Sequence, residues 1–451
     1  MKPLLGLSQL RLRPLLIMGE LSLIAALAFV ASRRELILVL ILPMGVGVVL
    51  TFLRWPSLGL IAASVAGLVI PFVGPSGLNA TMVLIALLLG LWLLDMMVRK
   101  RQTQLAASRT LWPLFCFLTI AVFSFGFGQL PWLTFAVHAP LGAQLGGLAI
   151  VVLSAGTFLL AAHQIQDLRW LRMITWAFLA VGALYLLLRS VLPALGLPTR
   201  DLLPQIGTVF FIWLPAMAFS QALVNEDLHP GWRWALGGLT LITLYVLFIL
   251  KFEDKSGWLS AFVCIAAIIG ARSWRVGLAL VPIAVLAVLF MWSGLVSTDE
   301  YSISTRFDAW SIMGQIIKIN PLWGLGFANY YWYTPLFPIR GYAVSFNSHN
   351  NYVDIVAQMG LVGLVCYLWL LWEIGWLGWG LRKQAQAGFA QAYVHGALGG
   401  LAGMAVAGML GDWVIPFFYN VGLNGFRSSM LGWLFLGGLV SIQQMELSRR
   451  K

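Results

Sequence analysis

The chain has 451 residues, of which 60% are hydrophobic and 10% are charged, and its mean hydropathy is +0.89. This composition excludes a soluble globular protein of this length and predicts an all-α polytopic membrane protein. The net charge of +12 does not indicate nucleic-acid binding, because most Lys and Arg residues stand in short clusters between apolar runs, where they set orientation.

Apolar runs of about 17–25 residues predict the membrane spans. The first run follows Lys2, Arg11 and Arg13, and we interpret it as an uncleaved helix because further spans follow at once. The others are centred near residues 44, 65, 88, 119, 152, 181, 215, 242, 264, 284, 367, 402 and 434. The pattern predicts about 12–14 transmembrane helices in a single integral membrane domain, residues 1–451.

Basic loops alternate with loops poor in charge, and this alternation predicts the orientation. Residues 74–78 and 126–140 contain no Lys, Arg, Asp or Glu. We therefore expect the basic loops and both termini to lie in the cytoplasm. Arg33-Arg34 is the exception. The basic set comprises Arg54, Arg99, Lys100, Arg101, Arg109, Arg169, Arg172, Arg233, Arg272, Arg275, Arg382, Lys383, Arg449, Arg450 and Lys451.

The same topology places the longest connection, residues 297–351, on the outer face. A connection of more than about 15 residues between membrane helices is usually functional. The topology also places a small set of cations on this face: Arg189, Arg200, Lys251, Lys255, Arg306, Lys318, Arg340 and Arg427.

The long connection opens with the pattern of an amphipathic helix. Thr305-x-x-Asp308 resembles a capping box, which puts Arg306 in the first turn. We expect this helix to lie on the outer leaflet, where a lone arginine is more often a surface side chain than a functional one. Its apolar residues recur at helical spacing before Pro321: Phe307, Trp310, Met313, Ile316 and Ile317.

Two motifs follow this helix. Asn320-Pro-Leu-Trp-Gly-Leu-Gly326 predicts a tight turn in which the backbone approaches another group closely, whereas two glycines alone are weak evidence for a phosphate site. The aromatic run from Tyr330 to Tyr333 suits either stacking on sugar rings or an interfacial belt, and we favour the belt.

His349 stands just before the next predicted helix. Asn347, Ser348 and Asn350 are good N-cap residues for a helix that begins near Asn351. A histidine at a helix N-terminus is disfavoured as imidazolium, so it should be neutral at about pH 7 and able to accept a proton. A capping role without chemistry is the alternative. The apolar helix that follows contains Gly360 and Gly363, one turn apart.

A further cluster, Lys251-Phe-Glu-Asp-Lys255, stands at the outer end of a span. Its two lysines and two acids either neutralise each other or hold an anionic ligand. Cations beside one neutral histidine suit an anionic lipid-linked substrate. The cations would hold a departing pyrophosphate, and the histidine would activate an attacking hydroxyl.

These motifs resemble the O-antigen ligase and O-antigen polymerase superfamily of bacterial envelope glycan transferases. His349-Asn350, a gap of nine residues and Gly360-x-x-Gly363 fit one family motif. Ser304-Thr-Arg306-x-x-x-Trp310 and then Pro321-x-x-Gly-x-Gly326 fit two others, in the same order. Together the motifs cover about sixty residues, 304–363.

The resemblance implies transfer of a glycan from undecaprenyl diphosphate to a hydroxyl of lipid A-core, another glycan or a protein. The reaction takes place at the outer face of the bilayer, without a nucleotide sugar, a metal or another cofactor. The resemblance also implies catalytic roles for His349 as the base and Arg306 at the diphosphate. Our candidate substrate-binding residues are Lys255, Asn350, Gly326 and Arg340. Many relatives have Ser-Arg-Gly where this chain has Lys255-Ser-Gly, and lysine lacks the bidentate fork of arginine.

Other interpretations remain at this point. Ligase and polymerase share these motifs, so the acceptor is open. A flippase or transporter of lipid-linked glycans has similar hydropathy, and Asp95, Asp412 and His395 would support it, although solvated or paired roles fit these residues better. The chain lacks the matching halves typical of transporters. A non-catalytic assembly protein would leave the ordered motifs without a role.

Overall fold

The computed structural model describes residues 45–101, 105–279 and 300–450, and the chain forms two compact units, residues 1–55 and 56–451. The described part of the first unit is the helix Gly45–Arg54, in which the Thr51 hydroxyl donates to the Gly47 carbonyl at 2.7 Å. The predicted first span and the span near residue 284 lie outside the described residues. The single-domain assignment stays a prediction.

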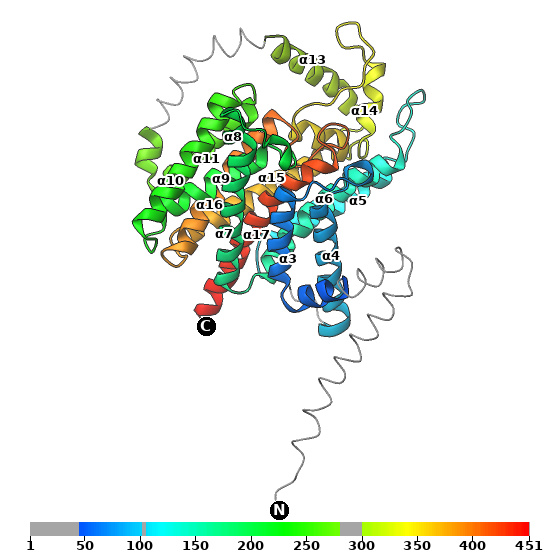
Figure 1. Cartoon of the computed structure of the whole chain (residues 1–451). Coiled ribbons are helices and arrows are strands. Elements are labelled where there is room, and N and C mark those ends of the chain that lie inside the picture. Colours follow the sequence, from blue (N-terminus) through cyan, green and yellow to red (C-terminus); the bar gives the residue numbers. More distant parts are fainter. Residues whose placement is uncertain (1–44, 102–104, 280–299, 451) are drawn as a thin grey trace, which may run out of the picture. The chain divides into compact units, whose positions relative to one another are not determined.

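The second unit is built from α-helices (Figure 1), and the β-pairing in its described residues consists of two isolated bridges. The α-helices are α3 (Pro56–Val69), α4 (Ala80–Leu94), α5 (Leu111–Phe127), α6 (Leu141–Gln164), α7 (Leu168–Leu186), α8 (Leu192–Ala194), α9 (Thr208–Val224), α10 (Pro230–Tyr245), α11 (Lys255–Arg272), α13 (Glu300–Ile317), α14 (Asn329–Tyr333), α15 (Asn351–Leu381), α16 (Phe389–Leu410) and α17 (Phe426–Arg449). Shorter helical turns are η1 (Pro75–Gly77), η2 (Asp95–Lys100), η3 (Leu187–Val191), η4 (Arg200–Leu202), η5 (Val246–Leu250), η6 (Thr334–Leu336) and η7 (Leu423–Gly425).

The all-α polytopic prediction is confirmed. In the described residues, 8 helices are long and apolar enough to cross a membrane. They match the predicted spans near residues 88, 152, 181, 242, 264, 367, 402 and 434. The apolar runs near residues 65, 119 and 215 form the shorter helices α3, α5 and α9. Polar caps set several helix starts. The side chain of Asn79 accepts the Met82 N–H before α4, and that of Asp254 accepts the Gly257 N–H before α11.

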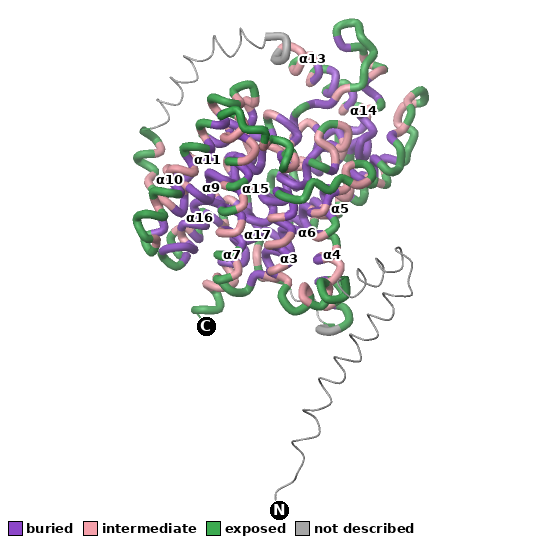
Figure 2. The backbone as a smooth tube through the Cα atoms, viewed as in Figure 1, coloured by how far each residue is buried: buried purple, intermediate pink, exposed green. Residues whose placement is uncertain are grey.

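Helix α17 lies in the middle of the second unit (Figure 2). The part of α17 that is long enough to cross a membrane is 100% buried, and the helix packs against α6, α9 and α16. The Ser441 hydroxyl lies 2.8 Å from the carbonyls of Ala161 and Ile165, so this buried polar group of α17 is satisfied by α6 and the residue that follows it. The burial of α17 gives the surrounding helices a common core.

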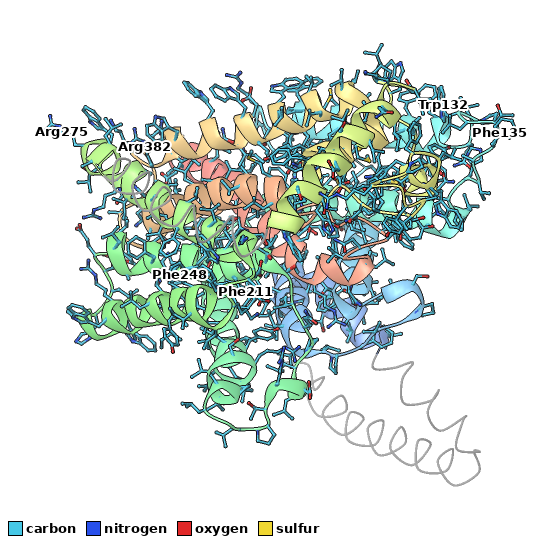
Figure 3. The ribbon with its side chains drawn as sticks, turned by 90° about the horizontal axis from the view of Figure 1, so that it is seen from above. Trp132, Phe135, Phe211, Phe248, Arg275 and Arg382 are labelled. Carbon is cyan, nitrogen blue, oxygen red and sulfur yellow. The ribbon has the colours of Figure 1, made fainter. Side chains whose placement is uncertain are left out.

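The helix ends gather into two sets. One end of the bundle, here called the His349 end, is where α15 and α17 begin and α16 ends. The loop from α5 to α6 also lies at this end, because the Ala139 N–H donates to the Asn329 side chain at 2.9 Å. The opposite set, the basic end, carries predicted basic loops of the second unit, and Arg382 donates there to the Ala271 carbonyl. Figure 3 shows Arg275 and Arg382 at one edge, and Trp132 and Phe135 of the α5–α6 loop at the other. Arg233 donates to Ala222, Arg272 to Leu223 and Arg449 to Gln386, so these basic loops of the second unit share one end of the bundle with the loop of Arg382.

Candidate functional site

Helix α15 contains a break at Gly360. This residue has φ 71° and ψ −179°, a backbone conformation outside the helical region that essentially only glycine adopts. The predicted apolar helix with Gly360 and Gly363 is present as α15, but the sequence did not predict its break at Gly360. The break leaves N–H and C=O groups on both sides without helical partners, and these groups need partners elsewhere.

The motif at residues 320–326 supplies those partners. Four backbone hydrogen bonds join it to α15: Leu361 N–H to Pro321, Val362 N–H to Leu322, Leu325 N–H to Ala357 and Gly326 N–H to Gln358, at 2.8–3.3 Å. A Cβ at Gly360 would collide with the Leu322 carbonyl, and one at Gly324 would collide with the Gln358 carbonyl. The predicted close approach of backbone is confirmed, and the group approached is the interrupted helix.

His349 lies in the turn that leads into α15. Its backbone is left-handed, with φ 49°, and the residue is exposed between the buried Ser348 and Asn350. The Asn350 side chain accepts the N–H groups of Tyr352 and Val353 at 2.9 and 3.2 Å, which confirms the predicted N-cap. Because Asn350 performs the capping, the imidazole of His349 is left for another role.

Helix α13 bonds to this turn and to α16. The Trp310 indole N–H donates to the Ser348 carbonyl at 2.8 Å, and Arg306 Nη1 donates to the Leu410 carbonyl at 3.1 Å. These contacts bring Arg306 to the place where α16 ends, close to the turn with His349. The two residues expected to be catalytic are thus brought together, although 43 positions separate them in the sequence (349 − 306).

The start of α13 differs from the prediction. The helix already includes Glu300, so Thr305 and Asp308 lie inside it, and the predicted capping box is wrong. The carboxylate of Asp308 instead accepts from Arg340 Nε at 2.7 Å. The amphipathic character is confirmed by a buried face, whereas Phe307 is 62% exposed. The buried residues are Ala309, Ile312, Met313 and Ile316.

Asp412 is the third charged group of the site. It lies between α16 and α17 and is fully buried, and its carboxylate accepts from Asn420 Nδ2 at 2.7 Å and from the Phe417 N–H at 3.1 Å. The expectation that Asp412 is paired is confirmed. Asp412 follows Leu410, the acceptor of Arg306, by two positions.

The charges of these residues act on one another. Desolvation lowers the pKa of His349 below its usual value, the charge of Asp412 opposes this shift, and the positive charge of Arg306 adds to it. Burial raises the pKa of Asp412, against the hydrogen bonds from Asn420 and Phe417 and the charge of His349. The shift favours the neutral imidazole, in the direction that the sequence predicted, although its main cause is desolvation. The role of His349 as a proton acceptor stays a prediction.

A buried polar cluster of Tyr330, Ser348 and Asp354 also holds the turn that contains His349. One carboxylate oxygen of Asp354 accepts from the Tyr330 hydroxyl at 2.5 Å and from the Ser348 hydroxyl at 2.7 Å. Burial, with the charge of Asp354, raises the pKa of Tyr330 well above its usual value, so the phenol keeps its proton and donates. The cluster links α14, the turn and α15, and fixes Ser348 next to His349.

The aromatic run has a different place from the predicted belt. Tyr330 and Tyr333 are 0% exposed and pack into the same core as Ile312 and Met313. The belt interpretation is therefore wrong for these two residues, because both rings are buried inside the protein. Tyr330 stacks on Phe417 with centroids 4.7 Å apart.

The other candidate residues have partners within the protein. The Arg340 guanidinium bonds to Asp308 and to Ser304 on α13. Gly326 has φ 87°, and a Cβ there would collide with Gly128, so this glycine allows two backbone segments to touch. Lys255 is the first residue of α11, beside the N-cap Asp254. Binding of substrate by Arg340, Gly326, Asn350 and Lys255 stays a prediction.

Sequence reasoning missed the participation of Asp412 and of the Asp354 cluster. Asp412 lies 63 positions beyond His349 (412 − 349) at the end of an apolar run, and nothing in the local pattern joins the two. Asp354 falls near the start of a predicted span. A carboxylate there is unusual enough in a membrane helix to mark a functional or structural polar cluster, and this was the signal that the sequence carried.

The family comparison covers this site. A family model described as O-antigen ligase matches residues 132–368, more than half of the chain, and the match includes Arg306, the glycine motifs and His349. No curated protein matches the chain. The sequence motifs, the helical membrane fold and the family match agree, and the chain belongs to the O-antigen ligase family.

Proposed function

We propose that this protein transfers a glycan from an undecaprenyl-diphosphate donor to a hydroxyl acceptor at the outer face of the plasma membrane. Membership of the O-antigen ligase family supports ligase- or polymerase-like glycan transfer in general. The observation that carries the specific proposal is the convergence of Arg306, His349 and Asp412 at one end of the bundle. Ligase activity is the first candidate, and polymerase activity the second.

The proposed reaction is a single displacement. His349 takes the proton of the acceptor hydroxyl while the oxygen attacks the first sugar carbon of the donor. The bond from that carbon to the diphosphate breaks, which inverts the carbon, and undecaprenyl diphosphate leaves. Arg306 stabilises the charge that develops on the departing diphosphate, with Lys255 as a further candidate. Asp412 stabilises His349 after it has become charged.

Replacement of Arg306 should weaken use of the donor more than use of the acceptor. One charge-assisted hydrogen bond contributes about 1.5–3 kcal/mol, so we expect Arg306→Ala to raise the KM for the donor roughly ten- to hundredfold. The KM of Arg306→Lys for the donor should lie between the values of the wild type and Arg306→Ala, because lysine keeps the charge but lacks the bidentate geometry of the guanidinium. Lys318→Ala, an exposed cation just after α13, is the matched control. Equal changes in both KM values would instead indicate loss of the bond to Leu410.

The pH dependence should follow His349. Catalysis needs the neutral imidazole, and because the pKa is lowered, activity should persist below about pH 6.5 and fall only as the pH drops through the shifted pKa. Asp412→Asn removes a charge that raises this pKa, so the acidic limb should move to still lower pH. A profile of kcat/KM against pH measures both effects. A limb with its midpoint above the ordinary histidine value would contradict the proposal.

We also propose that the His349 end faces the outside and that the basic end, with the C-terminus, faces the cytoplasm. The clustering of the basic loops at one end of the bundle supports this orientation, because such loops stay on the cytoplasmic side. The prediction that the N-terminus is also cytoplasmic concerns residues outside the described ranges.

An assay with purified protein tests the proposed reaction and separates the alternatives. The protein receives an undecaprenyl-diphosphate-linked oligosaccharide, with and without a lipid-core acceptor, in excess chelator. Product that requires the acceptor indicates a ligase, and ladders that form without it indicate a polymerase. Movement of donor across a liposome bilayer without transfer would contradict the proposal and favour a flippase.

A further inference from the structure

A second charged region lies at the His349 end, next to Asp412. A cavity of about 560 Å³ opens there between the ends of several helices, and its lining includes Lys251, Asp254, Trp413, Asn420 and Arg427. This volume is within the range of small-ligand pockets. Trp413 directly follows Asp412, and Asn420 donates to the Asp412 carboxylate at 2.7 Å. The cavity therefore adjoins the candidate site.

A smaller cavity of about 350 Å³ continues the first. Both are lined by Gln205, Ile206 and Lys251, and the smaller one adds Arg189 and Arg200. Four cations thus face the joined space against one carboxylate, Asp254. That carboxylate already accepts from the Ser256 hydroxyl at 2.6 Å and from the Gly257 N–H at 3.1 Å. The balance of charge in the joined cavities is strongly positive.

Two residues that line the larger cavity each carry a buried N–H donor with no acceptor among the described residues. Arg427 is 3% exposed and donates with Nη1 and Nη2 to the carbonyls of Ile70 and Phe72, at 2.7 and 2.5 Å. Its Nε–H is buried without a hydrogen-bond partner, and so is the indole N–H of Trp413. Buried donors without acceptors are unfavourable.

Lys251 adds a poised ammonium group. Its Nζ lies 4.2 Å from the ring centroid of Phe211, which is labelled on α9 in Figure 3. Burial lowers the pKa of Lys251, the nearby Asp254 opposes this, and Arg189 and Arg200 add to the lowering. An anion in the cavity would reverse this effect and stabilise the charged lysine.

We propose that the cavity of Lys251, Trp413 and Arg427 is a second phosphate-binding site, which takes the phosphate groups of a lipid-linked substrate. This inference rests on the proposed function for its substrate. The phosphate belongs either to the diphosphate of the donor or to a phosphorylated acceptor glycolipid. In both cases, the phosphate binds in the cavity that Lys251 and Arg427 line, on one side of the segment between α16 and α17. Arg306 contacts Leu410, just before this segment. The larger cavity is lined by Asp254 but not by Lys255, so Lys251 is the lysine of this cluster that we assign to the second phosphate site.

Equilibrium binding to the full chain in detergent tests the site without any need for transfer. The probes are undecaprenyl diphosphate, undecaprenol and a phosphorylated core glycolipid. We expect Lys251→Gln to bind a phosphorylated probe about tenfold more weakly, or weaker still, than the wild type does. Its affinity for undecaprenol should be unchanged. Lys251→Arg should retain affinity. Lys318→Gln, which removes an exposed cation outside the cavity, should bind as the wild type does.

The arms of the experiment have distinct meanings. Loss of affinity for undecaprenyl diphosphate assigns the site to the donor, and loss of affinity for the glycolipid assigns it to the acceptor. Arg427→Gln gives a second variant, and thermal unfolding shows whether it folds. Unchanged affinity for both phosphorylated probes in folded Lys251→Gln and Arg427→Gln would overturn the proposal. Binding without any glycan transfer would contradict the proposed function and leave the phosphate site standing.

Discussion

Replacement of His349 by alanine should lower kcat for glycan transfer by roughly 10²- to 10⁴-fold, the usual contribution of a general base. The variant loses the imidazole that accepts the acceptor proton but keeps the elements that shape the turn. Asn350 still caps α15, and Ser348 still bonds to Asp354. The rate of product formation at saturating donor and acceptor measures this effect, and donor binding should be unchanged.

Two controls accompany this variant. His349→Gln keeps a polar side chain of similar size but has no basic nitrogen, so it should be as inactive as His349→Ala. His395→Gln replaces another histidine, on α16, whose Nδ1 lies 2.9 Å from the Gln391 carbonyl, and should transfer glycan normally. Rates within a few-fold of the wild type in both His349 variants would remove the base from the mechanism.

Replacement of Gly360 by alanine should be the most damaging change to the structure of the site. A Cβ there would collide with the Leu322 carbonyl, and the left-handed backbone at φ 71° is itself strained for alanine by about 1–3 kcal/mol. Because the collision is with backbone, relief requires the 320–326 motif to leave α15. We expect destabilisation by about 3 kcal/mol or more in total and loss of transfer activity.

The matched control is Gly380→Ala, on the second part of the same helix. Nothing lies within 4 Å of a Cβ built there, and alanine is better than glycine in a helix by about 0.5–1 kcal/mol. Thermal unfolding in detergent compares the two variants, and Gly380→Ala should match or exceed the wild type. A Gly360→Ala protein as stable and active as the wild type would show that the break in α15 does not form.

Much of the membrane fold could be predicted from the sequence because burial in a bilayer demands long apolar runs. The runs near residues 152, 367 and 434 became α6, α15 and α17. Gly360 could not be recognised as a break, since its effect depends on backbone bonds to Pro321 and Leu322, about forty positions earlier. Periodicity describes contacts within a helix and carries no information about such distant partners.

The site was predictable in part for the same reason. The Asn350 cap depends on the neighbouring residues and was predicted correctly. The start of α13 was misjudged because Asp308, which resembled a capping residue, pairs with Arg340, thirty-two positions away (340 − 308). The positions of Tyr330 and Asp412 depend on the segment between α16 and α17, which returns to the site only in the folded chain.

Oriented proteoliposomes can show whether transfer takes place at the His349 end. A cysteine in place of the exposed Tyr342 at this end reports which side faces outward through labelling with an impermeant maleimide. Donor and acceptor are then confined to one side of the bilayer. We expect product only when both substrates share the side labelled at position 342. Product formed only on the side of Arg382 and the C-terminus would contradict it.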